Sequence, residues 1–275
     1  MKKVLLLVVL FIAQSSFAPK PITWVAIGDS ITYLNDHQNE TGNRVTKGYM
    51  TRVQEKMPQL QFTNKGYNGW TAIRIATEIE KLGLQKADLY SVFLGTNDWW
   101  GSKPLGIFAD YENNTGPTTV YGAFRVIINK LRSLNDQAKI VLITPMQRVD
   151  FVYINNPKNN AYGSYKPKNG QQLEDFAKAV VAIADYEKIP VLDLYHQKGM
   201  DHKNLVQFKR LKDSTTGNYV NYPYPDFIDK PFHPGVDEYP YPEAAQNITF
   251  DGLHPSDKGY EQITKGLLKI FKNLD

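Results

Sequence analysis

The sequence predicts an α/β fold in which a parallel sheet of five strands is covered by helices on both faces. Five short apolar runs rich in β-branched residues alternate with four longer stretches whose apolar residues recur at helical spacing. Strands and helices that alternate in this way form parallel sheets, because each helix returns the chain to the starting edge of the sheet. With 275 residues and 42% hydrophobic content, the chain can bury a substantial core.

The elements follow one another in a regular order along the chain. We expect strands at residues 22–28, 60–66, 87–95, 138–145 and 189–195. We expect helices at residues 71–84, 119–135, 170–188 and 256–274, the last with Ser256 as its N-cap. No internal repeat and no linker-like change of composition interrupts this order, so residues 19–275 are predicted to form one domain.

Two stretches depart from the alternation of strands and helices. Residues 146–169 are too polar to supply much core. Residues 196–250 are predicted to form a long irregular elaboration, and their Tyr- and Pro-rich part, 219–242, carries too many aromatic side chains for easy disorder. Because 219–242 leads directly into a histidine motif at 251–256, we expect it to form a wall or lid of the pocket beside that histidine.

The first 18 residues are typical of a secretory signal peptide. Lys2 and Lys3 precede the apolar run VLLLVVLFIA, and small polar residues follow it. Ser16 and Ala18 suit signal peptidase, but Pro19 would follow that cut, so an earlier site competes and the expected cut lies between residues 15 and 18. A membrane helix is the weaker interpretation, because a span requires about 20 apolar residues. We therefore expect a secreted or periplasmic protein that is not inserted in a membrane once the signal is removed.

Composition narrows the classes of partner. The chain has no cysteine, so neither a disulfide nor a cysteine-linked lipid can form. Its formal charge of +4 falls to +2 when the two leader lysines are removed, which leaves 30 of the 32 basic residues against 28 acidic ones. The basic residues are scattered, so we expect no nucleic-acid partner. The sequence specifies no oligomeric state.

Polar motifs follow the first three predicted strands, at the edge where parallel sheets bind ligands. Gly28 permits a tight turn before Ser30, which taken alone is an ordinary helix cap. Gly69, in NGWT, allows the backbone to approach a ligand closely, although turn glycines are common. Asn97, in GTND, can turn its amide into the same pocket or cap a turn.

A fourth motif, DGLHPS, precedes the last helix. Asp251 lies three residues before His254, a spacing that lets the carboxylate orient the imidazole and stabilise its protonated form. Pro255 and Ser256 fix the entry to the helix and so hold the histidine in place. Isolated Asp-x-x-His matches are common, and the four motifs become a strong signal only together and in this order.

This order of motifs resembles the SGNH hydrolases, also called the GDSL esterase/lipase family. The match comprises GDSIT with Ser30, NGWT with Gly69, GTND with Asn97, and DGLHPS with Asp251 and His254, and it spans about residues 25 to 260. The resemblance implies a flavodoxin-like three-layer α/β/α sandwich and a serine esterase without metal or cofactor. The chain has Ile where the family name has Leu, a difference that touches no catalytic group.

The resemblance also implies a role for each of these residues. Ser30 is the nucleophile, His254 is the general base, and Asp251 fixes the imidazole tautomer. The backbone N–H groups of Ser30 and Gly69 and the side-chain amide of Asn97 donate to the oxyanion.

The sequence favours two other assignments of its polar residues less strongly. His233 also precedes a proline and has Asp229 upstream, but no regular helix follows it, so His254 is preferred. A metal site for phosphoester hydrolysis lacks support, because the chain has no His-x-x-x-His pair and few histidines. The residues considered for that site are Asp29, Asn97, Asp98 and His254.

Aromatic residues next to the motifs indicate the substrate. Indoles beside Gly69 and Asn97 are placed to stack on sugar rings, although each could equally pack as local core. The predicted substrate contacts are Asp29, Trp70, Trp99, Trp100 and Tyr239. We expect hydrolysis of small acyl esters, acetate by default, on a carbohydrate; a lipase or lysophospholipase and a non-catalytic carbohydrate-binding protein are the alternatives.

Overall fold

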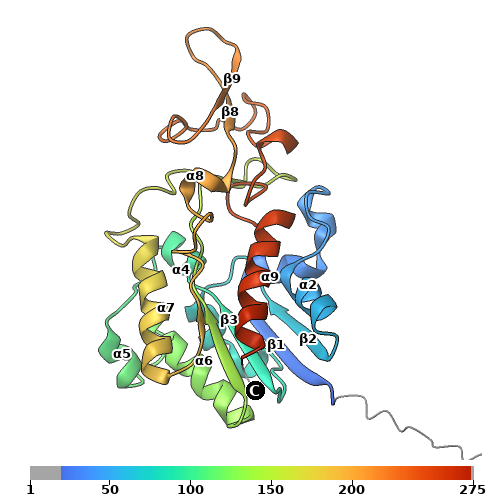
Figure 1. The fold of residues 1–275 in the computed structure, drawn as a ribbon. Helices are drawn as coiled ribbons and strands as arrows, with labels where there is room; N and C mark the ends of the chain where they lie inside the picture. The colour runs from blue at the N-terminus through green and yellow to red at the C-terminus, as the bar shows by residue number, and fades with distance from the viewer. Residues whose placement is uncertain (1–19, 274–275) are drawn as a thin grey trace, which may run out of the picture.

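Five parallel strands form the centre of the molecule, as predicted (Figure 1). The computed structural model describes residues 20–273, so the predicted signal peptide and its cleavage site lie outside the described residues. The strands stand in the order β2-β1-β3-β4-β7, with all neighbouring pairs parallel. Their bounds are β1 Ile22–Gly28, β2 Leu60–Gly66, β3 Leu89–Phe93, β4 Lys139–Ile143 and β7 Val191–Leu192.

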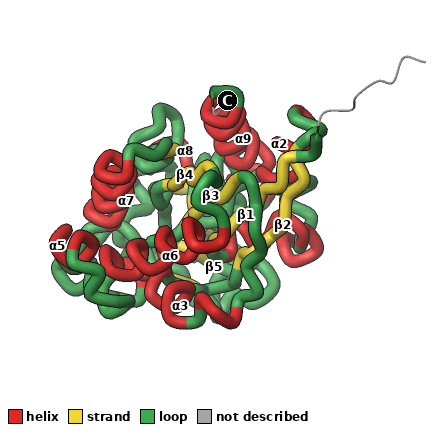
Figure 2. The backbone as a smooth tube through the Cα atoms, turned by 90° about the horizontal axis from the view of Figure 1, so that it is seen from below, coloured by secondary structure: helices red, strands yellow, loops and turns green. Residues whose placement is uncertain are grey.

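Helices cover both faces of this sheet, which gives three layers (Figure 2). One face is covered by α2 (Tyr49–Lys56) and α9 (Asp257–Phe271). The other is covered by α3 (Ala72–Thr77), α6 (Val120–Leu134) and α7 (Leu173–Glu187). Side chains of a strand alternate between faces, so β1 directs Trp24 toward the first layer and Val25 toward the second. The expected α/β/α sandwich is therefore confirmed.

The four predicted helices are present, one of them shortened, and an unpredicted helix joins those that cover the sheet. The expected helix at 71–84 ends at Thr77, whose hydroxyl donates to the Ile73 carbonyl at 2.7 Å, and the chain tightens into a 3₁₀ turn at 79–81. The last helix begins after Ser256 as predicted, and the Ser256 hydroxyl accepts the Gly259 N–H at 3.3 Å. Helix α2 was not predicted, and it packs beside α9.

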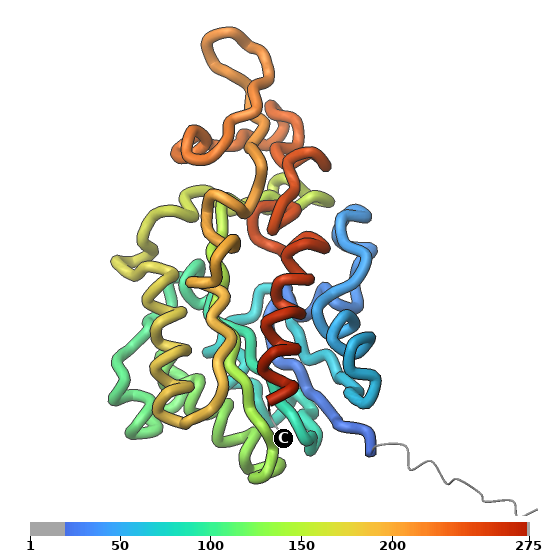
Figure 3. The backbone as a smooth tube through the Cα atoms, viewed as in Figure 1, coloured from blue at the N-terminus to red at the C-terminus, as the bar shows by residue number. Residues whose placement is uncertain are grey.

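Short elements occupy the connections. They are α1 Ser30–Tyr33, α4 Thr96–Trp100, α5 Phe108–Glu112, α8 His202–Leu205, the hairpin β5 Phe151–Val152 with β6 Asn160–Ala161, the hairpin β8 Lys209–Lys212 with β9 Tyr219–Tyr222, and 3₁₀ turns at 34–36, 38–41 and 243–245. The β8–β9 hairpin projects beyond the sheet (Figures 1 and 3). Within residues 20–273, no helix has the length and apolarity needed to cross a bilayer.

Residues 146–169 contribute to the core, contrary to the expectation from their polar composition. Met146, Val149 and Val152 are buried in the same apolar cluster as the inner face of α9. The segment therefore lies between the sheet and the elaboration formed by 196–250, a position that its local sequence does not reveal.

Candidate active site

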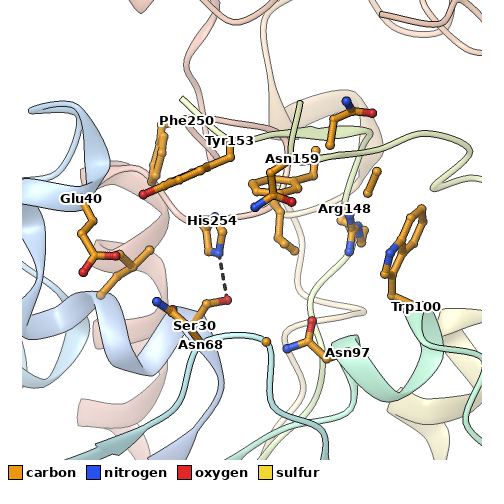
Figure 4. Close-up of a pocket in the computed structure, with 16 residues that line it drawn as sticks. Ser30, Glu40, Asn68, Asn97, Trp100, Arg148, Tyr153, Asn159, Phe250 and His254 are labelled. Atoms are coloured by element: carbon orange, nitrogen blue, oxygen red, sulfur yellow. Dashed lines mark hydrogen bonds between the residues drawn. The ribbon is translucent and has the colours of Figure 1, made fainter. Parts of the chain in front are cut away.

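Ser30 and His254 are joined by a hydrogen bond although 224 residues separate them (Figure 4). Ser30 is the first residue of α1, directly after β1, and its Oγ lies 2.8 Å from Nε2 of His254. The N-cap of α1 is Asp29, whose carboxylate accepts the Ile31 N–H at 3.0 Å. The cap is therefore Asp29, which leaves the Ser30 hydroxyl to face the imidazole.

The other ring nitrogen of His254 is bound by Asp251. Oδ2 of Asp251 lies 2.7 Å from Nδ1 of His254. Oδ1 of Asp251 accepts the backbone N–H groups of Leu253 at 3.0 Å and His254 at 2.7 Å. Both oxygens of this fully buried carboxylate are thus engaged. With the proton on Nδ1, the lone pair of Nε2 faces Ser30, so the arrangement can accept the proton of the serine hydroxyl.

The segment 146–169 supports the loop that carries this pair. The N–H of Val149 donates to the Gly252 carbonyl at 2.9 Å, and the N–H of Val152 donates to the Asp251 carbonyl at 3.1 Å. Gly252 has φ +92°, and a Cβ there would collide with the Asp150 carbonyl. The backbone of 146–169 therefore fixes the position of Asp251 and limits the residue beside it to glycine.

The loops after β2 and β3 bring Gly69 and Asn97 to the same place. Gly69 has φ +72° with no atom near its missing Cβ, so its backbone conformation rather than space requires glycine. Asn97 donates one amide hydrogen to the Trp70 carbonyl at 3.0 Å, which ties the two loops together and leaves its second N–H. Buried Asp98 adds bonds from the N–H groups of Ala72 at 2.8 Å and Ile73 at 3.3 Å, and burial raises its pKa to about 6.

A cavity of about 320 Å³ brings these groups together. Ser30, His254, Gly69 and Asn97 all line it. The remaining wall combines aromatic rings with polar side chains, two of them charged. Its residues are Leu34, Glu40, Asn68, Trp100, Arg148, Phe151, Tyr153, Asn159, Asn160, Ala161, Phe250 and Leu253.

The residues predicted to contact the substrate fall in different places. Trp100 lines the cavity. Trp70 stacks on Tyr67 instead, with ring centroids 4.5 Å apart, and buried Trp99 donates its Nε1–H to the Gln171 carbonyl at 3.0 Å. Asp29 is 2% exposed, and burial raises its pKa to about 6, so it faces the protein interior.

The Tyr- and Pro-rich loop 219–242 supplies none of the residues that line this cavity, so the expectation that it walls the acyl pocket is wrong. Tyr239 donates to the Val152 carbonyl at 3.0 Å, and Tyr241 donates to the Asp150 carbonyl. The loop therefore packs behind 146–169 and supports it. Six of the residues that line the cavity come from 146–169 itself, whose aromatic and asparagine-rich sequence is the signal available for this part of the wall.

Two other histidines, each with an aspartate beside it, lie outside the cavity. The N–H of His233 donates to Asp237 at 2.8 Å, a bond within its own loop, and His233 does not line the cavity. A second Asp-x-x-His pair, Asp193 with His196, has the same 2.7 Å contact between Oδ2 and Nδ1, but neither of its residues lines the cavity. Among residues 20–273, no three His, Cys, Asp or Glu side chains are grouped to hold a metal ion.

Comparison with known proteins gives the family and the fold. Residues 26–262 match the model of the GDSL-like lipase/acylhydrolase family. A possible lipase from Chitinophaga pinensis shares 61% identity and a TM-score of 0.90, covering 92% of this chain and 98% of that one. The comparison with curated proteins found no match.

More distant structures share the fold alone. A lipase/acylhydrolase from Enterococcus faecalis has 17% identity and a TM-score of 0.52, covering 92% of this chain and 96% of its own. A mutant of an acetyl-xylooligosaccharide esterase from Geobacillus has 18% identity and a TM-score of 0.51, covering 91% of this chain and 94% of its own.

Proposed function

This chain belongs to the GDSL-like lipase/acylhydrolase family, which makes it a carboxylic ester hydrolase, and we propose that it is a secreted serine esterase. Its substrate is a carbohydrate that carries small acyl esters, with acetate as the preferred acyl group. The observation that carries the proposal is the chain of hydrogen bonds from Ser30 through His254 to Asp251, with distances of 2.8 and 2.7 Å.

The first half of the reaction forms an acyl-enzyme. Ser30 Oγ attacks the ester carbonyl while its proton passes to Nε2 of His254, and Asp251 stabilises the resulting imidazolium. The C–O bond to the sugar then breaks, and His254 returns the proton to the departing alkoxide. In the second half, His254 removes a proton from water, the water oxygen attacks the acyl carbon, and Ser30 leaves with that proton.

Three donors are available for the negative charge that develops on the carbonyl oxygen. Ser30 opens α1, so its backbone N–H has no partner inside the helix. The backbone N–H of Gly69 and the second amide hydrogen of Asn97 complete the set. Such donors stabilise the tetrahedral intermediate more than the ester itself, which is why they accelerate the reaction.

The cavity wall supports a small acyl group and a polar alcohol. At about 320 Å³ the cavity lies at the small end of ligand sites, and asparagine residues from three segments line it. Phe151 and Trp100 add ring surfaces of the kind that pack on sugars. Secretion is supported by the signal-like sequence of residues 1–18.

Acyl-chain preference tests the proposal. Purified protein is assayed for acetate release from acetylated oligosaccharides and for cleavage of acetyl, butyryl and octanoyl nitrophenyl esters, with Ser30→Ala as the inactive control. We expect acetate release from glycans and a falling kcat/KM as the acyl chain lengthens. The Chitinophaga pinensis protein is described as a possible lipase, so the octanoyl ester is the informative competitor. Preference for octanoyl with no acetate released from any glycan contradicts the substrate assignment.

A further inference from the structure

Arg148 brings a buried positive charge without a protein partner to the wall of the catalytic cavity. Its side chain is 2% exposed and lines the cavity with Ser30 and Asn97 (Figure 4). Among residues 20–273, no hydrogen-bond acceptor lies within reach of its buried Nε and Nη2 atoms. Burial lowers its pKa only to about 10, so the guanidinium is charged at neutral pH. Proteins rarely bury such a group unpaired, because its desolvation is costly.

The neighbouring carboxylates are occupied elsewhere. Asp29, Asp150 and Asp251 are close enough to favour the charged form of Arg148 electrostatically. Asp251 binds His254, as described above, and Asp29 accepts the Ile31 N–H. No hydrogen bond joins any of the three to Arg148 in the described part of the chain.

Asp150 has a complete set of partners of its own. It accepts a 3.0 Å bond from the buried ammonium of Lys209 and bonds from the N–H groups of Gly163 and Ser164 at 2.8 and 3.0 Å. This carboxylate is therefore committed to joining 146–169 to the elaboration, and the charge of Arg148 remains unpaired.

The surroundings of Arg148 hold it in place and add to its positive charge. The Cζ atom lies 4.8 Å from the centroid of the Trp100 ring, a cation–π contact that leaves the in-plane N–H groups unbound. Nζ of Lys168 lies 4.0 Å from the same centroid. Two cations thus gather on one aromatic side chain of the cavity wall.

The opposite side of the cavity carries the opposite charge. Glu40 lines it there and accepts a 2.8 Å hydrogen bond from the Tyr33 hydroxyl (Figure 4). Ser30 and His254 lie between Glu40 and Arg148 in this view. An anionic ligand would be attracted to the Arg148 side and repelled from the Glu40 side, so the cavity favours one orientation of a charged substrate.

We propose that Arg148 binds a carboxylate carried by the substrate and so directs the enzyme toward anionic esters. The inference rests on the proposed function, because it concerns the substrate hydrolysed at Ser30. A planar guanidinium suits a carboxylate, since two of its N–H groups can bind the two oxygens together. The carboxylate can belong to the sugar, as in a uronic acid, or to the acyl group, as in a half-ester of a dicarboxylic acid.

Matched ester pairs test this proposal and separate the two sources. The sugar arm compares an acetylated methyl glucuronoside with the same acetylated methyl glucoside. The acyl arm compares nitrophenyl hemisuccinate with nitrophenyl butyrate. For each pair the readout is the ratio of kcat/KM values, anionic over neutral, which cancels any general loss of activity.

We expect the wild-type protein to prefer the anionic member in one arm, and Arg148→Gln to lower that ratio about ten- to hundredfold. Arg148→Lys keeps the charge without the planar fork, so its ratio should be intermediate, and it is the more conservative variant if Gln at this buried position prevents folding. The control is Arg210→Gln on β8, whose guanidinium pairs with Glu238 away from the cavity; its ratio should equal that of the wild type. A wild type with no anionic preference in either arm, or an Arg148→Gln ratio equal to the wild-type ratio, overturns the proposal.

Equilibrium binding separates this inference from the proposed function. Calorimetry measures the binding of glucuronate, succinate and glucose to the Ser30→Ala protein, with and without Arg148→Gln. Hydrolysis of neutral esters by the wild type without binding of either carboxylate supports the esterase and contradicts the anion site. Binding of one carboxylate that requires Arg148, together with no hydrolysis of any ester, supports the anion site and contradicts the esterase.

Discussion

Replacement of Asp251 by Asn should invert the tautomer of His254. Oδ1 of Asp251 accepts two backbone N–H groups, from Leu253 and His254. In the variant the amide oxygen must keep this place, because an NH₂ group there would face two donors at a buried site, at a cost of about 1–3 kcal/mol. The amide nitrogen then faces Nδ1 of His254 in place of Oδ2 and donates to it. Nδ1 becomes an acceptor, so the ring proton moves to Nε2, the atom that must accept the proton of Ser30.

The expected loss of activity is large while the fold is kept. The equivalent substitution in a serine protease triad lowers kcat by about 10⁴, which corresponds to about 5 kcal/mol of barrier at 1.36 kcal/mol for each factor of ten. The 2.7 Å contact between Asp251 and His254 is buried, so the same reasoning applies here. The assay is kcat/KM for nitrophenyl acetate, with the tautomer read from ¹⁵N chemical shifts of the histidine ring.

The chain contains a matched control for this substitution. Asp193 and His196 have the same spacing and the same 2.7 Å contact between Oδ2 and Nδ1, but neither lines the cavity. Asp193→Asn should therefore leave kcat/KM unchanged. Two results would contradict a role for Asp251 in setting the tautomer of His254. One is a folded Asp251→Asn protein that retains more than about a tenth of the wild-type activity, and the other is a ring proton that stays on Nδ1 in this variant.

Three further outcomes are expected. Asn97→Ala removes one oxyanion donor and should lower kcat about 10²- to 10³-fold with little change in KM; an equal rise in KM at constant kcat would assign Asn97 to substrate binding instead. Burial raises the pKa of Asp29 from its ordinary 3.8 to about 6, so the folded state binds the proton more tightly and wild-type stability should fall as pH rises from about 4 to 6. Asp29→Asn is the control, because it keeps a helix cap but does not titrate. In urea unfolding between about pH 4 and 6, the free energy of unfolding of the wild type should fall by up to about 3 kcal/mol relative to that of this variant. A difference between the two proteins that stays constant over this range contradicts the raised pKa of Asp29. Asp150→Ala leaves the buried ammonium of Lys209 unpaired and should lower the free energy of unfolding by about 3–5 kcal/mol, whereas a loss below about 1 kcal/mol would show that the pair does not stabilise the fold.

The sheet could be predicted because its signals are local. All five strands lie within the predicted ranges. The three inner strands β1, β3 and β4 are largely buried apolar runs, which can be recognised whatever their neighbours are, whereas the edge strand β2 is only partly buried. The edge strand β7 pairs over only two residues, so its predicted range, 189–195, was too long. The candidate site was predictable for a related reason: each of its motifs ends a strand or begins a helix, and parallel topology gathers those points at one edge.

The missed features depend on contacts between distant segments. Helix α2 has eight residues and no side-chain cap, and it is stabilised by packing against α9 rather than by its own sequence. Residues 146–169 look like a polar loop, yet Val149 and Val152 bond to the loop that carries Asp251. The cavity wall was assigned to 219–242 because that stretch adjoins His254 in sequence. Tyr239 and Tyr241 instead donate to backbone carbonyls of 146–169. These contacts depend on the tertiary fold and cannot be inferred from the local sequence.

Covalent labelling is the direct test of whether His254 and Asp251 activate Ser30 as the nucleophile. The protein is treated with a fluorophosphonate, and intact-mass and peptide mass spectrometry locate the adduct while esterase activity is followed. We expect one adduct per chain, on Ser30, that forms in step with the loss of activity and is absent from His254→Ala. Activity that survives complete labelling of Ser30, or an inactivating adduct on another residue, would contradict it.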